Sequence, residues 1–188
     1  TVNYTQAYET GSIGQAQLNA PGPAALFASL TYGNAYNYIL NFTDCLYTQW
    51  NSYMRRTPTN VGVGLVGLAN NGGSAVPSAF GNVIALVHDP GNMTTVNGGL
   101  TGNWFVWVKD ASGQSLYNTG VAPTGTWQFV EFEYNNTGVP YVEVKINGVV
   151  VATVPNTDPN LFVSQAPAAN AGLKPVIYCG KTIAATGG

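Results

Sequence analysis

The stretch "GTWQFVEFEYNNTGVPYVEVKINGVVVATV" (residues 125–154) is the most informative part of the sequence for predicting the fold, because it contains three strand patterns joined by turn signals. Apolar and polar residues alternate over 126–134 and again over 141–146, which is typical of strands with one buried face. Asn147-Gly148 then precedes the apolar run at 149–154. An Asn-Gly pair between two strand patterns is the strongest short-range signal of a β-hairpin. We therefore predict three strands in succession over residues 126–154.

Three of the eight acidic residues of the chain, Glu131, Glu133 and Glu143, fall in the first two of these strands. If the apolar faces of the strands coincide, all three carboxylates share the polar face. One register places Glu131 beside Lys145 as a weak ion pair and Glu133 opposite Glu143. A catalytic pair, a metal site and a plain outer surface are all compatible with this pattern. We favour the outer surface.

The rest of the chain also consists of short β-branched or aromatic runs bounded by Gly, Asn and Pro. Many short strands with frequent turns predict an all-β sandwich of two sheets, or jelly roll. The "PGP" at 21–23 separates residues 1–20, a tail or donor strand, from a sandwich domain over 21–188. The further runs that we interpret as strands cover residues 35–50, 61–70, 81–89, 103–110, 110–120 and 173–183.

Residues 1–20 carry a few apolar side chains on a polar background. They are either the first strand of their own sandwich or an extended tail that completes the sheet of a neighbouring subunit by strand addition. On the second interpretation, an unpaired sheet edge and an apolar groove in one copy are filled by the next copy. The expected donor-strand residues are Val2, Tyr4, Tyr8, Ile13 and Leu18.

The composition is unusually poor in charge. Charged residues make up 7% of the 188 residues, against about 25% in a typical protein. Six basic and eight acidic residues give a net charge of −2, so we expect no nucleic-acid partner, and without a long apolar run we expect no membrane insertion. This surface suggests an extracellular protein at the cell surface in a hot, acidic setting. An ordinary secreted β-protein is the alternative.

Cysteines and glycosylation sequons also suggest export. Cys45 and Cys179 would form one disulfide in an exported chain and two buried thiols in a cytosolic one. A disulfide between them would close a long loop and stabilise the folded chain by about 4–5 kcal/mol in the chain-entropy model. Asn-x-Ser/Thr sequons mark candidate N-glycosylation sites, and they begin at Asn3, Asn41, Asn92 and Asn135.

Few residues of the chain are candidates for a metal site or a catalytic site. "HDPGN" at 88–92 could supply calcium ligands through Asp89 and Asn92, but too few to predict a metal, and we interpret His88 as a surface loop residue. His88 is the only histidine and no nucleophile elbow is present, so a hydrolytic triad is the least favoured of these sites. Glu131 and Glu133 could be the two acids of a glycoside hydrolase, but the third acid of the glucanase pattern is absent.

Glycan binding requires exposed aromatic rings beside polar groups at a rim. Trp50, Tyr53, Trp104 and Trp107 are the candidates for such a platform, although aromatic residues of a sandwich more often belong to the core. We interpret Trp127 as core or edge packing. We expect no cofactor and no enzymatic activity.

Residues 125–154, with Trp127 opening a strand and Asn147-Gly148 closing the next, resemble the signature hairpin of the concanavalin A-like lectin/glucanase superfamily, which includes laminin G-like domains. The resemblance extends over roughly residues 60–155 and implies a two-sheet jelly roll. That superfamily contains lectins, hydrolases and structural modules. The low charge, the sequons and the polar tail are more broadly similar to archaeal thread-type surface-filament subunits.

The sequence thus favours a secreted, non-enzymatic subunit of a cell-surface filament or pilus, assembled from copies of itself by insertion of residues 1–20 and coated by N-glycans. A carbohydrate-binding, lectin-like module is the alternative, followed by a glycoside hydrolase or a viral coat protein.

Overall fold

A computed structural model of the chain describes residues 2–5, 15–18, 27–31, 47–58, 62–69, 80–90, 100–110, 113–135, 137, 141–154 and 174–180. These residues form strands, turns and irregular segments, and none of them lies in a helix that is long and apolar enough to cross a membrane. The strands are β1 (Val2–Thr5), β2 (Gln15–Leu18), β3 (Phe27–Thr31), β4 (Tyr47–Arg55), β5 (Val63–Ala69), β6 (Val83–Asp89), β7 (Leu100–Asp110), β8 (Gly113–Asn118), β9 (Trp127–Asn135), β10 (Tyr141–Ile146), β11 (Val149–Val154) and β12 (Lys174–Gly180).

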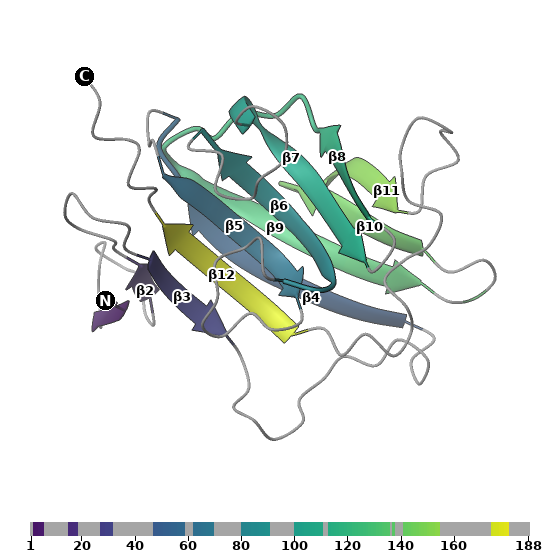
Figure 1. The fold of residues 1–188 in the computed structure, drawn as a ribbon, viewed down its shortest axis with the longest axis horizontal. Helices are drawn as coiled ribbons and strands as arrows, with labels where there is room; N and C mark the ends of the chain where they lie inside the picture. Colours follow the sequence, from purple (N-terminus) through teal and green to yellow (C-terminus); the bar gives the residue numbers. More distant parts are fainter. Residues whose placement is uncertain are drawn as a thin grey trace.

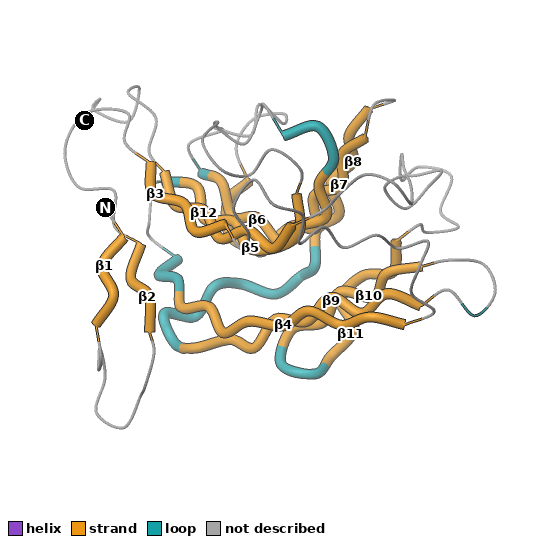
Figure 2. Tube along the Cα trace, turned by 90° about the horizontal axis from the view of Figure 1, so that it is seen from below, coloured by secondary structure: helices purple, strands orange, loops and turns teal. Residues whose placement is uncertain are grey.

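The two main sheets pack face to face as a sandwich. One sheet has six strands in the order β3-β12-β5-β6-β7-β8, and the other has four in the order β11-β10-β9-β4. Neighbouring strands within both sheets are antiparallel. Figure 1 shows the strands of the two sheets one behind the other, and Figure 2 shows the two layers edge-on. The predicted all-β, two-sheet architecture is confirmed.

The predicted strands over 126–154 are β9, β10 and β11. In β9 and β10 the residues alternate between buried and half-exposed positions. Asn147 and Gly148 form the turn after β10 with positive φ values of 52° and 77°, which Asn and Gly adopt at the lowest cost. The Asn147 Oδ1 also accepts a hydrogen bond from the Phe129 N–H over 2.8 Å, so the turn is fixed to β9.

The main core lies between the sheets. Val130, Phe132 and Tyr134 of β9 point towards the six-stranded sheet, which contributes Ile84, Leu86 and Trp104 among others. Burial of each large apolar side chain stabilises the fold by about 1.5–3 kcal/mol. The remaining buried members of this core are Val66, Leu68, Val106, Val108, Val142, Val144, Ile146 and Val154.

The central strands of the six-stranded sheet are buried on both faces. Every residue of β5 and β6 is buried, and the outward side chains form a second cluster that includes Leu65, Val87 and Trp107. Gly67 is required at its position because an added Cβ would lie 2.4 Å from the Ala85 Cα. Continuous apolar runs, instead of alternating ones, follow from burial on two sides.

The N-terminal tail and β4 differ in part from the expectations. β1 and β2 pair with each other as a separate two-stranded antiparallel sheet, with Val2 opposite Leu18. The tail therefore contains two short paired strands in this chain, and insertion into a neighbour stays a prediction. Of the strand expected over 35–50, only residues 47–50 are described, and β4 continues to Arg55.

Candidate binding face on the four-stranded sheet

The four-stranded sheet has an outer face, turned away from the core, that is composed mainly of polar and aromatic side chains. It forms the lower layer in Figure 2, and no further described strand lies beneath it. Alternation along β4, β9 and β10 places every second side chain on this face. These side chains are Gln49, Asn51, Tyr53, Arg55, Trp127, Phe129, Glu131, Glu133, Glu143 and Lys145.

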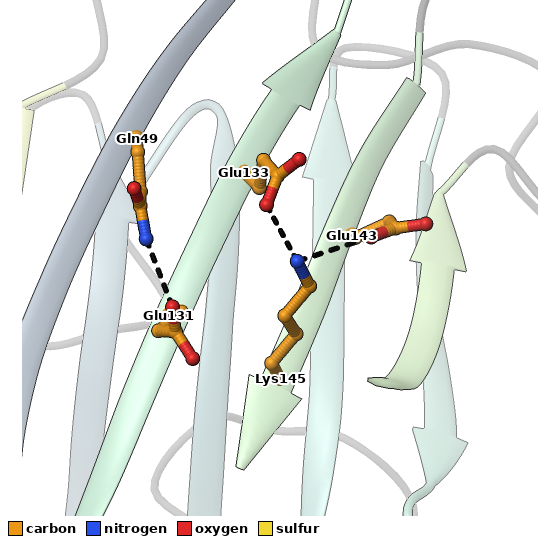
Figure 3. Close-up of polar contacts among 5 residues, drawn as sticks. All are labelled: Gln49, Glu131, Glu133, Glu143 and Lys145. Atoms are coloured by element: carbon orange, nitrogen blue, oxygen red, sulfur yellow. Dashed lines mark hydrogen bonds and ion pairs between the residues drawn. The ribbon is translucent and has the colours of Figure 1, made fainter. Parts of the chain in front are cut away.

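The three carboxylates of β9 and β10 lie on this outer face, as predicted. The register pairs Glu133 with Glu143 and Glu131 with Lys145. However, the predicted Glu131–Lys145 ion pair is wrong. The Lys145 Nζ lies 2.5 Å from Glu133 Oε2 and 3.3 Å from Glu143 Oε2, and Figure 3 shows the ammonium between these two carboxylates.

Lys145 lies opposite Glu131 in the register but bonds diagonally to Glu133, and the cause is electrostatic. Glu133 and Glu143 are directly opposite each other on neighbouring strands, so their like charges repel, and one cation between them offsets that repulsion. Hydrogen bonds to both glutamates raise the pKa of Lys145 above its ordinary value, against a smaller opposing effect of burial. Glu131 instead accepts a hydrogen bond from Gln49 Nε2 over 2.8 Å.

This arrangement does not resemble a hydrolytic site. A glycoside hydrolase holds the glycosidic oxygen or a water molecule between its two carboxyl groups. Here the space between Glu133 and Glu143 is occupied by the ammonium of Lys145, and Glu131 is bonded to Gln49. The geometry is that of a surface ion-pair network next to a hydrogen-bonded carboxylate.

Beyond Glu131, towards the start of β9, the outer face becomes aromatic. Tyr53 is 65% exposed, and its ring centroid lies 4.8 Å from that of Phe129, at an interplanar angle of 39°. Two residues further along, Trp127 is 38% exposed beside Arg55. The interpretation of Trp127 as core or edge packing is therefore wrong, because β9 is an internal strand and the ring points away from the core.

Of the other aromatic residues proposed for a glycan platform, none has an exposed ring. Trp104 and Trp107 are 1% and 0% exposed. Trp50 is half-buried, packs against the main core and lies 5.5 Å from Phe132 between ring centroids. Tyr53 is the one predicted platform residue that the structure places on the surface.

The interior contains a buried polar cluster, Arg56, His88, Asp89 and Gln128, that the sequence did not reveal. The Arg56 Nε donates to His88 Nδ1 over 2.8 Å, and its Nη2 donates to the carbonyl oxygens of Gly62 and His88. Arg56 follows β4, whereas His88 lies in β6, so these bonds join the two sheets. Trp104 Nε1 donates to Gln128 Oε1 over 3.0 Å.

The interpretation of His88 as a surface loop residue is wrong: it is a fully buried strand residue. Because Nδ1 accepts from Arg56, the neutral ring carries its proton on Nε2, which has no hydrogen-bond partner among the described residues. Burial, then the charge of Arg56, lowers the pKa of His88 to about 4, whereas Asp89 has the opposite effect. Burial also lowers the pKa of Arg56 to about 10, so Arg56 is charged at neutral pH.

Arg56 packs closely on the backbone of β5. A Cβ added to Gly64 would lie 2.6 Å from Arg56 Nη1, so the absence of a side chain at Gly64 provides the space for the guanidinium. On the neighbouring strand, burial raises the pKa of Tyr178 to about 12. The interior thus holds the charged guanidinium of Arg56 beside the neutral imidazole of His88, with Asp89 buried in the same cluster.

Several predicted site residues lie outside the described part of the chain. These are Tyr8, Ile13, Cys45, Asn41 and Asn92. The disulfide therefore stays a prediction, with Cys179 placed in β12 opposite Gly64. A calcium site at Asp89 and Asn92 gains no support, since the described residues contain no group of three or more His, Cys, Asp or Glu that could hold a metal ion.

Two of the sequons can be placed. Asn3 lies in β1, opposite Gln17 of β2. Asn135 ends β9, and its Oδ1 accepts hydrogen bonds from the N–H of Thr137 over 2.9 Å and from the Thr137 hydroxyl over 2.7 Å. These bonds use the Oδ1 of Asn135 and not its Nδ2, the atom that a glycan would modify.

No protein-family model matches the sequence, and no curated protein matches it in sequence. Solved structures match it in fold. A mutant of the Emp46p carbohydrate recognition domain superposes with a TM-score of 0.54 at 10% identity, covering 88% of this chain and 75% of that one. The Emp47p carbohydrate recognition domain superposes with a TM-score of 0.53 at 8% identity, covering 98% of this chain and 81% of that one.

At this level of identity the likeness concerns the fold alone. Emp46p and Emp47p carbohydrate recognition domains have the concanavalin A-like β-sandwich fold of legume lectins, and this chain shares it. The predicted concanavalin A-like sandwich fold is confirmed. The further resemblance to archaeal filament subunits gains no support from these matches.

Proposed function

We propose that this chain is a carbohydrate-binding, lectin-like module that binds a glycan on the outer face of its four-stranded sheet. One observation carries the proposal: the exposed Tyr53 ring packs against Phe129, and the next pair of side chains along the same face, two residues away on each strand, is Asn51 and Glu131. An apolar ring next to a few convergent polar groups is the usual composition of a small-ligand site.

The aromatic part of this site is held in place before any ligand binds. The contact with Phe129 limits the orientations of the Tyr53 ring, so less rotamer entropy is lost on binding. The apolar C–H face of a sugar can then cover the exposed side of the ring. Tyrosine suits this role because it offers a large, rigid contact area with a polar tip.

The polar part is positioned by the strand register. Asn51 lies directly opposite Glu131, and Gln49 donates to one oxygen of Glu131. That bond orients the carboxylate and leaves its second oxygen available as an acceptor. A sugar hydroxyl donating to a carboxylate forms a charge-assisted hydrogen bond, which is stronger than a neutral one.

The solved structures of similar fold support this function over a filament subunit, since both Emp46p and Emp47p matches are carbohydrate recognition domains. A shared fold alone does not establish a shared function. The proposal therefore rests on the outer face, and assembly by tail insertion stays an untested prediction.

The proposal is tested by glycan-array binding and affinity electrophoresis with the Tyr53→Ala variant. We expect the unmodified protein to bind a defined subset of glycans, and Tyr53→Ala to weaken that binding at least about tenfold, or about 1.4 kcal/mol. Tyr117→Ala is the matched control, because Tyr117 is a 38% exposed tyrosine on the other sheet. The proposal is wrong if no glycan binds, or if the two variants lose affinity equally.

A further inference from the structure

We infer that the ligand of this face is an uncharged oligosaccharide of at least two sugar residues that lies along β4 and β9. The inference rests on the proposed function and specifies its ligand. It derives from the positions of two aromatic rows on the outer face. The first row is Tyr53 with Phe129, and the second is Trp127 with Arg55.

The two rows follow each other along the strand direction. Phe129 and Trp127 are two residues apart on β9, as are Tyr53 and Arg55 on β4, and each such step is about 7 Å long. Alternation places both rows on the same side of the sheet, and Tyr53 and Trp127 are both exposed there. One sugar ring covers one row, so a ligand that uses both must contain a second ring along the strands.

Arg55 helps to define the second row. Its Nε donates to the Gly125 carbonyl oxygen over 2.8 Å, which anchors the guanidinium beside Trp127 at the start of β9. On the other side of the Tyr53 row lie Asn51 and Glu131. The face therefore changes from aromatic to polar along one line, which favours an extended chain over a compact, branched group.

The charge of the polar half determines the kind of sugar. Glu131, Glu133 and Glu143 carry three negative charges and Lys145 carries one positive charge, which leaves a net charge of −2. A field of this sign repels uronic and sialic acids and does not act on neutral sugars. Arg55 lies at the opposite end of the face and does not neutralise this half.

The test measures the affinity of gluco-, manno-, xylo- and galacto-oligosaccharides of one, two and four residues by calorimetry. We expect affinity for the bound series to rise about tenfold from the monosaccharide to the tetrasaccharide. Trp127→Ala should remove this gain, whereas Tyr53→Ala should weaken the binding of every length. Trp127→Phe, which keeps a ring, should retain most of the gain, and Tyr117→Ala should retain all of it.

Charge selection is measured in parallel with tetragalacturonate and neutral galactotetraose. We expect the acidic sugar to bind at least tenfold more weakly, and the difference to narrow as salt screens the carboxylates. If no neutral series binds, the proposed function itself fails. If a series binds with equal affinity at all lengths, or if Trp127→Ala weakens monosaccharide and tetrasaccharide alike, the function stands and the two-row ligand is wrong.

Discussion

The polar residues of the sandwich fall into two regions whose surroundings differ completely. On the outer face of the four-stranded sheet, Glu133, Glu143 and Lys145 form ion pairs while their side chains keep 19–28% of their surface exposed. In the buried polar cluster, Arg56 and His88 are at most 4% exposed and hydrogen-bond to each other across the two sheets. Arg55 and Arg56 are consecutive in the chain and belong to different regions.

This difference decides what each region can do. Water competes for the outer groups, so their mutual interactions are weak and a ligand can replace them at little cost. Inside, no water replaces a lost partner, so each removed bond leaves an unsatisfied buried group. The interior polar residues therefore stabilise the sandwich, and the outer ones are available for recognition.

Arg56→Ala should produce the largest loss of stability, because Arg56 belongs to the buried polar cluster. It tests directly whether the buried polar residues stabilise the fold more than the outer ones do. The change removes the donors to His88 Nδ1 and to the carbonyl oxygens of Gly62 and His88. We expect the free energy of unfolding to fall by about 3–5 kcal/mol, because three buried acceptors lose a charged donor and each unsatisfied acceptor costs about 1–3 kcal/mol. Urea denaturation followed by tryptophan fluorescence measures it.

The adjacent arginine is the matched control. Arg55 is exposed and donates to Gly125, so Arg55→Ala should change the free energy of unfolding by about 0.5 kcal/mol or less. Equal losses in the two variants would show that the interior contacts of Arg56 contribute no more than surface ones.

Acid should act selectively on the buried region through His88, whose pKa of about 4 in the folded chain lies below its ordinary value of 6.5. Between these pH values the unfolded chain binds a proton that the folded chain does not. Stability from the neutral imidazole is thus fully present above pH 6.5 and is lost as pH falls towards 4. The expected loss is about 3 kcal/mol, measured by urea denaturation at stepwise pH.

His88→Gln is the control for this pH dependence. Its carboxamide oxygen can still accept from Arg56 Nε, but it cannot titrate. The slope of stability between pH 6.5 and 4 should therefore flatten in the variant. An unchanged slope would show that the pH dependence does not come from His88.

The sequence predicted the regions where periodicity is unambiguous. Alternation over β9 and β10 identified the outer face, because a one-residue slip would turn every apolar side chain outward. The pairing of Glu133 with Glu143 was one register compatible with that pattern, and the structure has it. Asn147-Gly148 fixed the hairpin into β11. The continuous apolar runs of β5 and β6 predicted strands, although not the second core on their outward side.

The sequence could not predict contacts between distant strands. His88 looks like a loop residue because polar residues follow it, and only the packing of Arg56 across the sandwich shows that it is buried. Trp127 and Trp104 have similar neighbours in sequence, yet one is outside and the other inside. Lys145 reaches diagonally to Glu133 because its long stem is not restricted to the residue opposite it.

Lys145→Ala should have the smallest effect on stability, because the ion pairs of Lys145 lie on the partly exposed outer face. It measures how little the polar contacts of that face contribute. Without the ammonium, the opposed carboxylates of Glu133 and Glu143 lose the cation between them. We expect a loss of about 0.5–1 kcal/mol in the free energy of unfolding at low salt, since these side chains are partly exposed. The loss should shrink in 1 M salt, where the Debye length is about 3 Å. Urea denaturation at the two salt concentrations measures it.

A double-mutant cycle separates the ion pair from general surface effects. Glu133→Gln should couple to Lys145→Ala, because Lys145 Nζ lies 2.5 Å from Glu133 Oε2. Glu131→Gln is the matched control: Glu131 lies opposite Lys145 in the register but bonds to Gln49, so its coupling to Lys145 should be near zero. Equal coupling at both glutamates would mean that Lys145 responds to the charge of the whole face. The outer residues would then act as a diffuse field that repels anionic ligands, while the position of an individual carboxylate would matter little.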